Sequence, residues 1–110
     1  MPTPAEFFAI EMRVATVLAA QAFPEARKPS IKLTLDFGPG LGVRQSSAQL
    51  TTHYTPASLA GRQVVAVVNI GTRNIAGFTS ECLVLGACPT AEEVILLSID
   101  HPVANGTRIA

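Results

Sequence analysis

The chain has 110 residues, with eight Lys or Arg, eight Asp or Glu and a formal net charge of zero. This length suits one compact domain, and the hydrophobic share of 48% excludes a disordered segment, which would be poor in apolar residues and rich in charge. Zero net charge excludes a strongly basic protein that binds nucleic acid through its overall charge. Only 15% of the residues are charged, against roughly 25% in an average domain, so we expect a partner, such as a second copy of the chain, to cover some apolar surface.

The sequence shows no signal for secretion or for membrane insertion. Its N-terminus lacks a basic segment followed by a long apolar stretch, and its longest apolar runs, such as Val64–Val68, are far shorter than the roughly twenty residues that span a membrane. Cys82 and Cys88 are the only cysteines and form no CxxC pair, which favours isolated thiols over a disulfide or a metal site. We therefore expect a cytoplasmic protein without membrane insertion, bound metal or cofactor.

The N-terminal part of the chain predicts one short helix and two strands. Thr3–Glu6 has a capping Thr, a Pro and a Glu at the spacing of a helix start. Val and Ala residues favour a strand over Met12–Ala20, and the two prolines of Phe23–Ser30 indicate a loop after it. Ile31–Phe37 alternates apolar and polar side chains, as a strand with one buried face does, and Gly38–Gly40 ends it.

The rest of the chain predicts a short helix between further strands. Val43–Thr51 is a more polar strand candidate, and Thr55–Gly61 has the capping Thr, following Pro and terminal Gly of a short helix. Gln63–Ile70 is a Val-rich run typical of a buried strand, and Gly71–Gly77 is a predicted loop with room for a short strand turn. The remaining predicted elements are strands over Cys82–Ala87 and Val94–Ile99 and a tight turn at Asn105-Gly106 before Thr107–Ile109.

Five main strands with a helix between the third and the fourth favour one architecture over its rival. The chain is predicted to be all-β, a single domain over residues 1–110 that forms a five-stranded oligonucleotide/oligosaccharide-binding (OB) barrel with a short helix between strands 3 and 4. The rival is an immunoglobulin-like sandwich, which needs about seven strands and no central helix.

No set of residues predicts catalysis. His53 and His101 stand alone, and the HExxH, GxSxG and phosphate-cradling Gly-Lys-Ser/Thr patterns do not occur. Gly38–Gly42 contains a proline and leads into no predicted helix, so it indicates a hairpin connection. The adjacent Glu92 and Glu93 have no identifiable facing carboxylate. We therefore do not expect an enzyme.

Basic residues near the predicted loops are more informative. Arg27, Lys28 and Lys32 lie around the loop before the second strand, Arg44 opens the third strand, and Arg73 follows the fourth. In a small barrel these positions can converge on one groove and contact phosphates; ordinary solubilising charge is the alternative, and the sequence leaves both open. Five Phe, one Tyr and no Trp offer few stacking platforms for a general single-strand binder, whereas recognition of a folded RNA by shape needs fewer.

Several dispersed motifs form a recognisable pattern. Arg13–Val17 begins the first strand, and Asn69 is followed by Gly77–Ser80 and by the apolar Leu83–Leu85. This pattern resembles the tRNA-binding OB-domain family, whose members are appended to methionyl-tRNA synthetases or stand alone. The departures from the pattern are Ala15 and Ala48 where many relatives have Gly, Leu83 where many have Met, and Ile70–Arg73 without the proline that relatives often carry.

Within that family, Phe23–Pro29, Ile75–Glu81 and Asn105–Ile109 resemble the bacterial CsaA-type proteins, which are chaperone-like, secretion-related homodimers. The likeness runs from about Phe7 to the C-terminus. It implies an OB barrel with N- and C-terminal extensions that build a dimer, in agreement with the apolar composition. The dimer interface residues implied in this sequence are Phe7, Phe8, Ile10, Val94 and Leu96, the last two within the segment Val94–Leu97.

The resemblance also implies what the groove binds, and it leaves two hypotheses. In the first, the protein is a chaperone that holds unfolded or pre-secretory polypeptides in an apolar pocket near Phe78 and Leu83. In the second, the same groove binds tRNA or another structured RNA, with the basic residues on its phosphates. The predicted ligand-binding residues are Asn69, Ser80, Arg44, Ser46, Ser47, Arg73, Phe78, Leu83, Lys32, Arg27 and Lys28.

Overall fold

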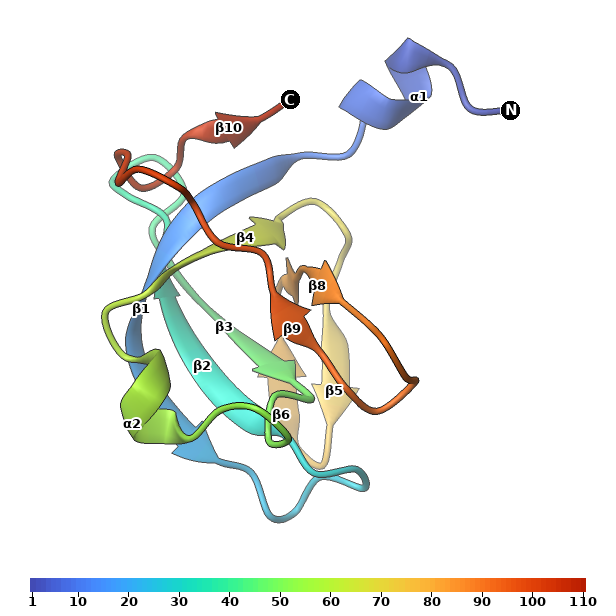
Figure 1. Ribbon diagram of the computed structural model, residues 1–110. Coiled ribbons are helices and arrows are strands. Elements are labelled where there is room, and N and C mark those ends of the chain that lie inside the picture. The colour runs from blue at the N-terminus through green and yellow to red at the C-terminus, as the bar shows by residue number, and fades with distance from the viewer.

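A single curled antiparallel sheet forms most of the molecule. The computed structural model describes all residues, 1–110. The main sheet has the strand order β3-β2-β1-β4-β7, with β10 paired to β1 outside this path (Figure 1). Its strands are β1 (Met12–Ala22), β2 (Ile31–Asp36), β3 (Val43–Ala48), β4 (Gln63–Val67), β7 (Leu83–Val84) and β10 (Arg108–Ile109). The order and the antiparallel pairing confirm the predicted OB fold.

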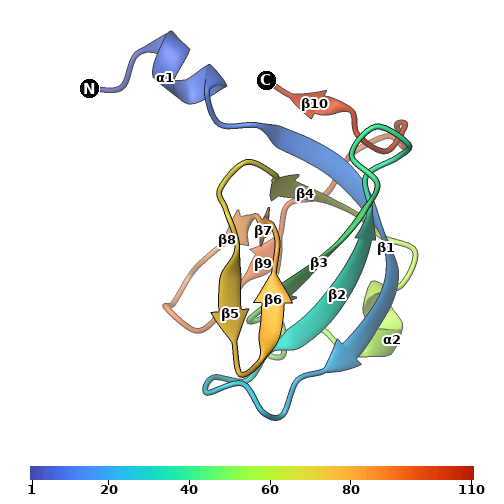
Figure 2. The same cartoon turned by 180° about the vertical axis from the view of Figure 1, so that it is seen from behind.

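Two small hairpins flank this sheet. The first pairs β5 (Arg73–Ile75) with β6 (Phe78–Ser80), and the second pairs β8 (Gly86–Ala87) with β9 (Ile95–Leu96). Figure 2 shows β5 and β6 side by side, with the loop that joins β1 to β2 passing below them. We call residues 73–80 the β5–β6 hairpin and residues 23–30 the β1–β2 loop.

Both short helices begin where the sequence predicts. α1 (Pro4–Phe8) has Thr3 as its N-cap in a capping box with Glu6, and α2 (Pro56–Leu59) has the same reciprocal bonds between Thr55 and Ser58. α2 lies between β3 and β4, as predicted, and buries Leu59 in the core. With five and four residues, neither helix has the length that crossing a membrane requires.

The inner face of the curled sheet carries one apolar core. In β2, Ile31, Leu33 and Leu35 are at most 1% exposed, and the polar residues between them are half-buried on the outer face, so the predicted alternation is confirmed. β1 joins the two halves of the sheet, because its first part pairs with β4 and its second part with β2. A register shift between Val17 and Ala19 lies where β1 passes from one partner to the other.

The sheet nearly closes because the free edge of β3 bonds to residues 79–82. The Glu81 N–H donates to the Gln45 carbonyl at 2.8 Å, and the buried Ser46 hydroxyl donates to the Cys82 carbonyl at 2.8 Å. The Gln45 side-chain amide adds a bond to the Thr79 carbonyl at 2.9 Å. These bonds place the β5–β6 hairpin against β3.

Several predicted strands are shorter than the sequence indicates. The strand predicted over Val43–Thr51 ends at Ala48, that over Gln63–Ile70 ends at Val67, and that over Val94–Ile99 is only β9. The strand predicted over Cys82–Ala87 is divided at Leu85, whose N–H bonds to Val65 of the main sheet while its carbonyl accepts from Leu97. One continuous apolar run thus contributes strands to two sheets, and the spacing of apolar residues in the sequence does not reveal where it divides.

The C-terminal turn is docked tightly on β1. The Thr16 hydroxyl donates to the Asn105 side-chain oxygen at 2.7 Å, and the Gly106 N–H donates to the Val14 carbonyl at 2.7 Å. Gly106 has φ +88°, and a Cβ atom added there would lie 2.5 Å from the Phe37 carbonyl oxygen. Both the left-handed backbone and the close approach therefore require glycine.

Replacing Gly106 should destabilise the fold by a defined amount. We expect Gly106→Ala to lower the free energy of unfolding by about 2–3 kcal/mol, because a left-handed alanine costs roughly 1–2 kcal/mol and its methyl must also displace a backbone oxygen. Urea denaturation measures the change. The matched control is Gly40→Ala, where nothing lies within 4 Å of the added Cβ; equal decreases in the two variants would contradict this account.

Candidate ligand-binding groove

A groove of about 410 Å³ lies between the β1–β2 loop, the end of β3, the β5–β6 hairpin and β7. This volume falls within the roughly 300–1,000 Å³ of typical ligand sites. The groove brings together five predicted ligand-binding residues: Arg27, Lys28, Ser47, Arg73 and Leu83. Its other lining residues are Ala26, Ser30, Ala48, Gln49, Ile75, Val84 and Val94. In OB folds, the loop between strands 1 and 2 and the loop between strands 4 and 5 border the ligand site, and this groove has that position.

The groove combines unpaired cations with an apolar floor. None of its lining residues is acidic, and the three ion pairs of the structure (Arg13–Glu11, His53–Glu93 and His101–Asp100) include none of its cations. We call its larger apolar lining residues, Ile75, Leu83, Val84 and Val94, the apolar floor; of these, Leu83 is 47% exposed. The groove can therefore bind a ligand that carries both negative charge and apolar surface.

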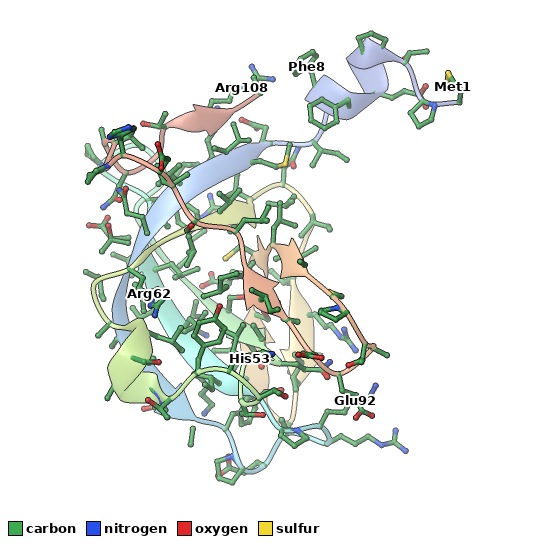
Figure 3. The ribbon with its side chains drawn as sticks, in the orientation of Figure 1. Met1, Phe8, His53, Arg62, Glu92 and Arg108 are labelled. Atoms are coloured by element: carbon green, nitrogen blue, oxygen red, sulfur yellow. The ribbon has the colours of Figure 1, made fainter.

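A second hollow of about 300 Å³, lined mainly by polar and charged residues, adjoins the groove at the β1–β2 loop. The two share Arg27, Lys28 and Gln49. The hollow adds the hydroxyls of Thr51 and Thr52, and also Glu92, which Figure 3 shows near the tip of the loop between β8 and β9. An extended ligand can follow the β1–β2 loop from one depression into the other.

Two predicted serines lie behind the groove rather than in it. Ser46 is fully buried and donates its hydroxyl to the Cys82 carbonyl. Ser80 is 8% exposed, and its hydroxyl accepts the Ser47 N–H at 3.1 Å. Both hydroxyls thus bond β3 to residues 80–82. Of the three predicted serines, only Ser47 lines the groove. The prediction placed both Ser46 and Ser47 of the third strand in the groove, although neighbouring residues of a strand face opposite sides.

Asn69 and Arg44 make contacts away from the groove. The Asn69 amide accepts the Glu11 N–H at 2.8 Å and donates to the Ala9 carbonyl at 2.7 Å, so it fixes the segment that connects α1 to β1. The Arg44 guanidinium donates to the Val68 carbonyl at 2.9 Å. Neither residue lines the groove, so the structure does not bring these two predicted ligand contacts to the other five.

Lys32 and Phe78 border a separate hollow on the outer face of β1, β2 and β3. Its volume is about 140 Å³, well below the roughly 300 Å³ at which ligand pockets begin. The Lys32 ammonium lies 4.4 Å from the Phe23 ring centroid and 5.0 Å from that of Phe78. The predicted site is therefore divided, with these two residues on a different surface from the groove.

The predicted interface residues fall into two groups. Phe7, Phe8 and Ile10 are 44–47% exposed, and α1 buries none of its residues and projects from the barrel (Figure 1). Arg108 reaches back to Phe8, with its guanidinium 5.5 Å from the ring, and Figure 3 shows the pair beyond the barrel. Val94 and Leu96 instead pack against the core. The exposed residues of that segment are Ile95 and Leu97, at 40% and 46%, which the prediction missed because it did not assign the faces of the strand.

Sequence reasoning also missed groove residues that carry no charge. Ala26, Gln49 and Ile75 line the groove, yet their side chains are common in any loop or strand. Ala26 and Ile75 lie within the two stretches on which the CsaA-type resemblance rests, and this is the signal that could have marked them. Gln49 follows β3 directly, and only the tertiary structure places it near the β1–β2 loop.

The two cysteines are both free thiols, but their environments differ. Cys82 is 5% exposed, and burial raises the pKa of its thiol to about 11, whereas Cys88 is exposed. Both are free, and no group of three or more His, Cys, Asp or Glu side chains is placed to hold a metal ion.

The chain is similar in sequence to proteins of a known family. The family described as "Putative tRNA binding domain" matches residues 12–108. The chain belongs to this family. A methionine–tRNA ligase of Rhodopirellula baltica is 41% identical over 104 residues, which cover 94% of this chain but 15% of the ligase. A methionine–tRNA ligase of Methanococcus aeolicus is 36% identical over 104 residues, with the same coverage of 94% and 15%. The chain thus corresponds to about one seventh of the length of these relatives.

Two solved structures match the chain over its whole length. The chaperone CsaA of Bacillus anthracis has 47% sequence identity and a TM-score of 0.95, covering 100% of this chain and 99% of its own. The CsaA chaperone protein of Picrophilus torridus has 41% identity and a TM-score of 0.90, with both chains covered completely. The resemblance to CsaA-type proteins is therefore confirmed, and it includes both terminal extensions.

The different environments of the two thiols can be tested by alkylation. At pH 8 in native buffer, iodoacetamide should modify Cys88 within minutes and leave Cys82 unmodified, because the buried thiol stays protonated and inaccessible. Mass spectrometry should show one adduct on the native chain and two in denaturant. Two adducts at equal rates on the native chain would contradict the burial of Cys82.

Proposed function

We propose that this chain is a homodimeric, CsaA-type chaperone that holds unfolded or pre-secretory polypeptide segments in the groove. The observation that carries the proposal is the apolar floor left open to solvent, where Leu83 is 47% exposed beside Ile75. An extended polypeptide can place apolar side chains on this floor, and acidic side chains can meet Arg27 and Arg73 at its walls. The similarity to two CsaA chaperones, at 47% and 41% identity, supports this proposal.

We propose a binding role without catalysis. The groove contains cations, hydroxyls and apolar groups, but its lining offers no Asp, Glu, His, Cys or Tyr side chain to form a general acid–base pair with Lys28. His53 is bonded to Glu93 outside the groove, beside Tyr54. The proposed compartment is the cytoplasm, where free thiols such as these two persist.

A second candidate ligand is tRNA, and one observation favours it. Arg27, Lys28 and Arg73 form no ion pair within the chain, so their charges are free to neutralise phosphates. Zero net charge limits non-specific attraction, so RNA would be held by this local cluster alone. The match to the tRNA-binding family is consistent with this alternative.

The proposed dimer places α1 and the exposed side of β9 in the interface. Phe7, Phe8, Ile10, Ile95 and Leu97 are all 40–47% exposed, which is costly for large apolar side chains that gather in two extensions of a small domain. The two hydrogen bonds of the Asn69 side chain, to the Glu11 N–H and the Ala9 carbonyl, hold α1 in a fixed position relative to the barrel. A preformed arm of this kind loses little entropy when a second copy covers it.

Salt dependence separates the two candidate ligands. We expect a carboxymethylated, permanently unfolded polypeptide to bind with little change between 50 and 300 mM salt, because contact with an apolar floor is weakly screened. Leu83→Ser should weaken this binding about tenfold, as the removal of roughly 1–2 kcal/mol of apolar burial requires. Fluorescence anisotropy measures both affinities.

The tRNA arm of the same experiment uses cation variants. Binding of tRNA should weaken steeply with salt, and Arg27→Met should reduce the slope by about 0.7–0.9 for each phosphate that the arginine neutralises in the wild type. The matched control is Arg62→Met, which removes the same charge outside the groove, where Arg62 lies over Tyr54. If polypeptide does not bind the wild-type chain at any salt concentration, the chaperone proposal is wrong; if tRNA does not bind at low salt, the RNA candidate is wrong.

Light scattering tests the proposed dimer. The chain should have the mass of two copies at micromolar concentration, and deletion of residues 1–10 should shift it to monomer. Asn69→Ala should raise the dimer dissociation constant without unfolding the barrel, because it releases the Ala9 and Glu11 backbone groups from their clamp. Circular dichroism provides the folding control. A stable wild-type monomer would rule out this use of the apolar surface.

A further inference from the structure

We propose that Phe23, Lys32 and Phe78 form a latch that ties the β5–β6 hairpin to the β1–β2 loop and so sets the width of the groove. The inference rests on the proposed function, because it assumes that the groove is the ligand site. It gives Lys32 and Phe78 a positioning role in place of direct contact with a ligand. The latch is defined by these three side chains alone.

The three side chains form one compact stack. The rings of Phe23 and Phe78 meet edge to face, with centroids 5.5 Å apart at an interplanar angle of 66°. The Lys32 ammonium lies over both rings, 4.4 Å and 5.0 Å from their centroids, and it takes part in none of the ion pairs of the structure. An ammonium within about 6 Å of a ring centroid is attracted by the ring, and here one cation serves two rings.

The stack joins two of the elements that line the groove. Phe23 begins the β1–β2 loop, which carries Arg27 and Lys28, and Phe78 belongs to the hairpin, which carries Arg73 and Ile75. Phe23 is 2% exposed and so provides a fixed anchor. Figure 2 shows the lower end of the hairpin next to the loop. The separation of the groove cations therefore depends on this contact.

The turn of the hairpin is strained, although within it the Gly77 N–H donates to the Asn74 side-chain oxygen at 3.0 Å. Its β6 side is held to β3 through Thr79 and Ser80, but its turn contains Ala76 with φ +48° next to Gly77 with φ +83°. A left-handed alanine is strained, and such strain persists only where the surroundings enforce it. Phe78 directly follows this turn, so its ring is placed to hold the strained end.

A ligand pocket at these residues is the alternative, and size argues against it. The hollow bordered by Lys32 and Phe78 has about 140 Å³, one third of the volume of the groove. Lys32 is also already engaged by two rings, so contact with a phosphate would require it to leave them. The groove cations have no such competing partner.

Hydrogen exchange of the full-length protein tests the latch without any ligand. In Lys32→Met, which keeps the side-chain length but removes the charge, the amides of residues 73–80 should exchange about tenfold faster than in the wild type, which corresponds to a decrease of about 1.4 kcal/mol in local stability. Phe78→Leu should do the same without a change of charge. Lys32→Arg should keep exchange near the wild-type rate. Unchanged exchange in both Lys32→Met and Phe78→Leu would overturn the proposal.

A salt titration with bulk tRNA then separates positioning from contact. Lys32→Met should weaken binding several-fold with the wild-type salt slope, whereas Arg27→Met should lower the slope by about 0.7–0.9. If Lys32→Met lowers the slope as Arg27→Met does and leaves hairpin exchange unchanged, Lys32 binds phosphate and the latch is wrong. If the wild-type chain binds neither tRNA nor unfolded polypeptide, the proposed function fails, while the exchange experiment still decides whether the latch exists.

Discussion

Closure of the sheet along the free edge of β3 is the constraint on which the rest of the structure depends. On this side β3 has no neighbouring strand in the main sheet, so it bonds to residues 79–82 instead. Gln45 and Ser46 of β3 donate to the Thr79 and Cys82 carbonyls, and the Ser80 hydroxyl bonds to that of Ser46. Buried backbone groups must be paired, and two small hydroxyls can reach them without filling the core. Because the β5–β6 hairpin leads directly into this segment, closure also determines where one wall of the groove stands.

This constraint explains why the resemblance to a family and the geometry assign different roles to the same residues. Asn69 and Ser80 belong to the family-like motifs, yet one fixes the N-terminal segment and the other pairs the edge of β3. Residues that recur in a family can thus preserve the frame of a site. The chemistry of the groove comes from neighbours that the frame positions, chiefly the cations of the β1–β2 loop and of the hairpin.

The sequence was sufficient for the fold, because each main strand and both helix starts have local signals. The alternation in Ile31–Leu35 and the caps at Thr3 and Thr55 are of this kind. The extent of the strands was not predictable, since the division at Leu85 depends on which sheet supplies a bonding partner. For the site, the loop cations could be found because charged residues are visible in the sequence. Lys32 and Arg27 line different hollows, because the Lys32 side chain lies on the outer face of β2 whereas Arg27 lies on the β1–β2 loop, and this the sequence does not reveal.

The two candidate ligands make different demands on the same groove, and the structure can meet both because its charge and its apolar surface are separate. The cations belong to the β1–β2 loop and the hairpin, whereas the exposed leucine belongs to β7. A polymer of phosphates needs the cations at a fixed spacing, whereas an unfolded polypeptide needs access to the apolar residues. The position of the hairpin controls both, since moving it away from the loop would expose more floor and separate the cations. A chain with zero net charge has no long-range attraction to compensate for a poor spacing, so under the proposed function the ligand preference would depend on how firmly the hairpin is held.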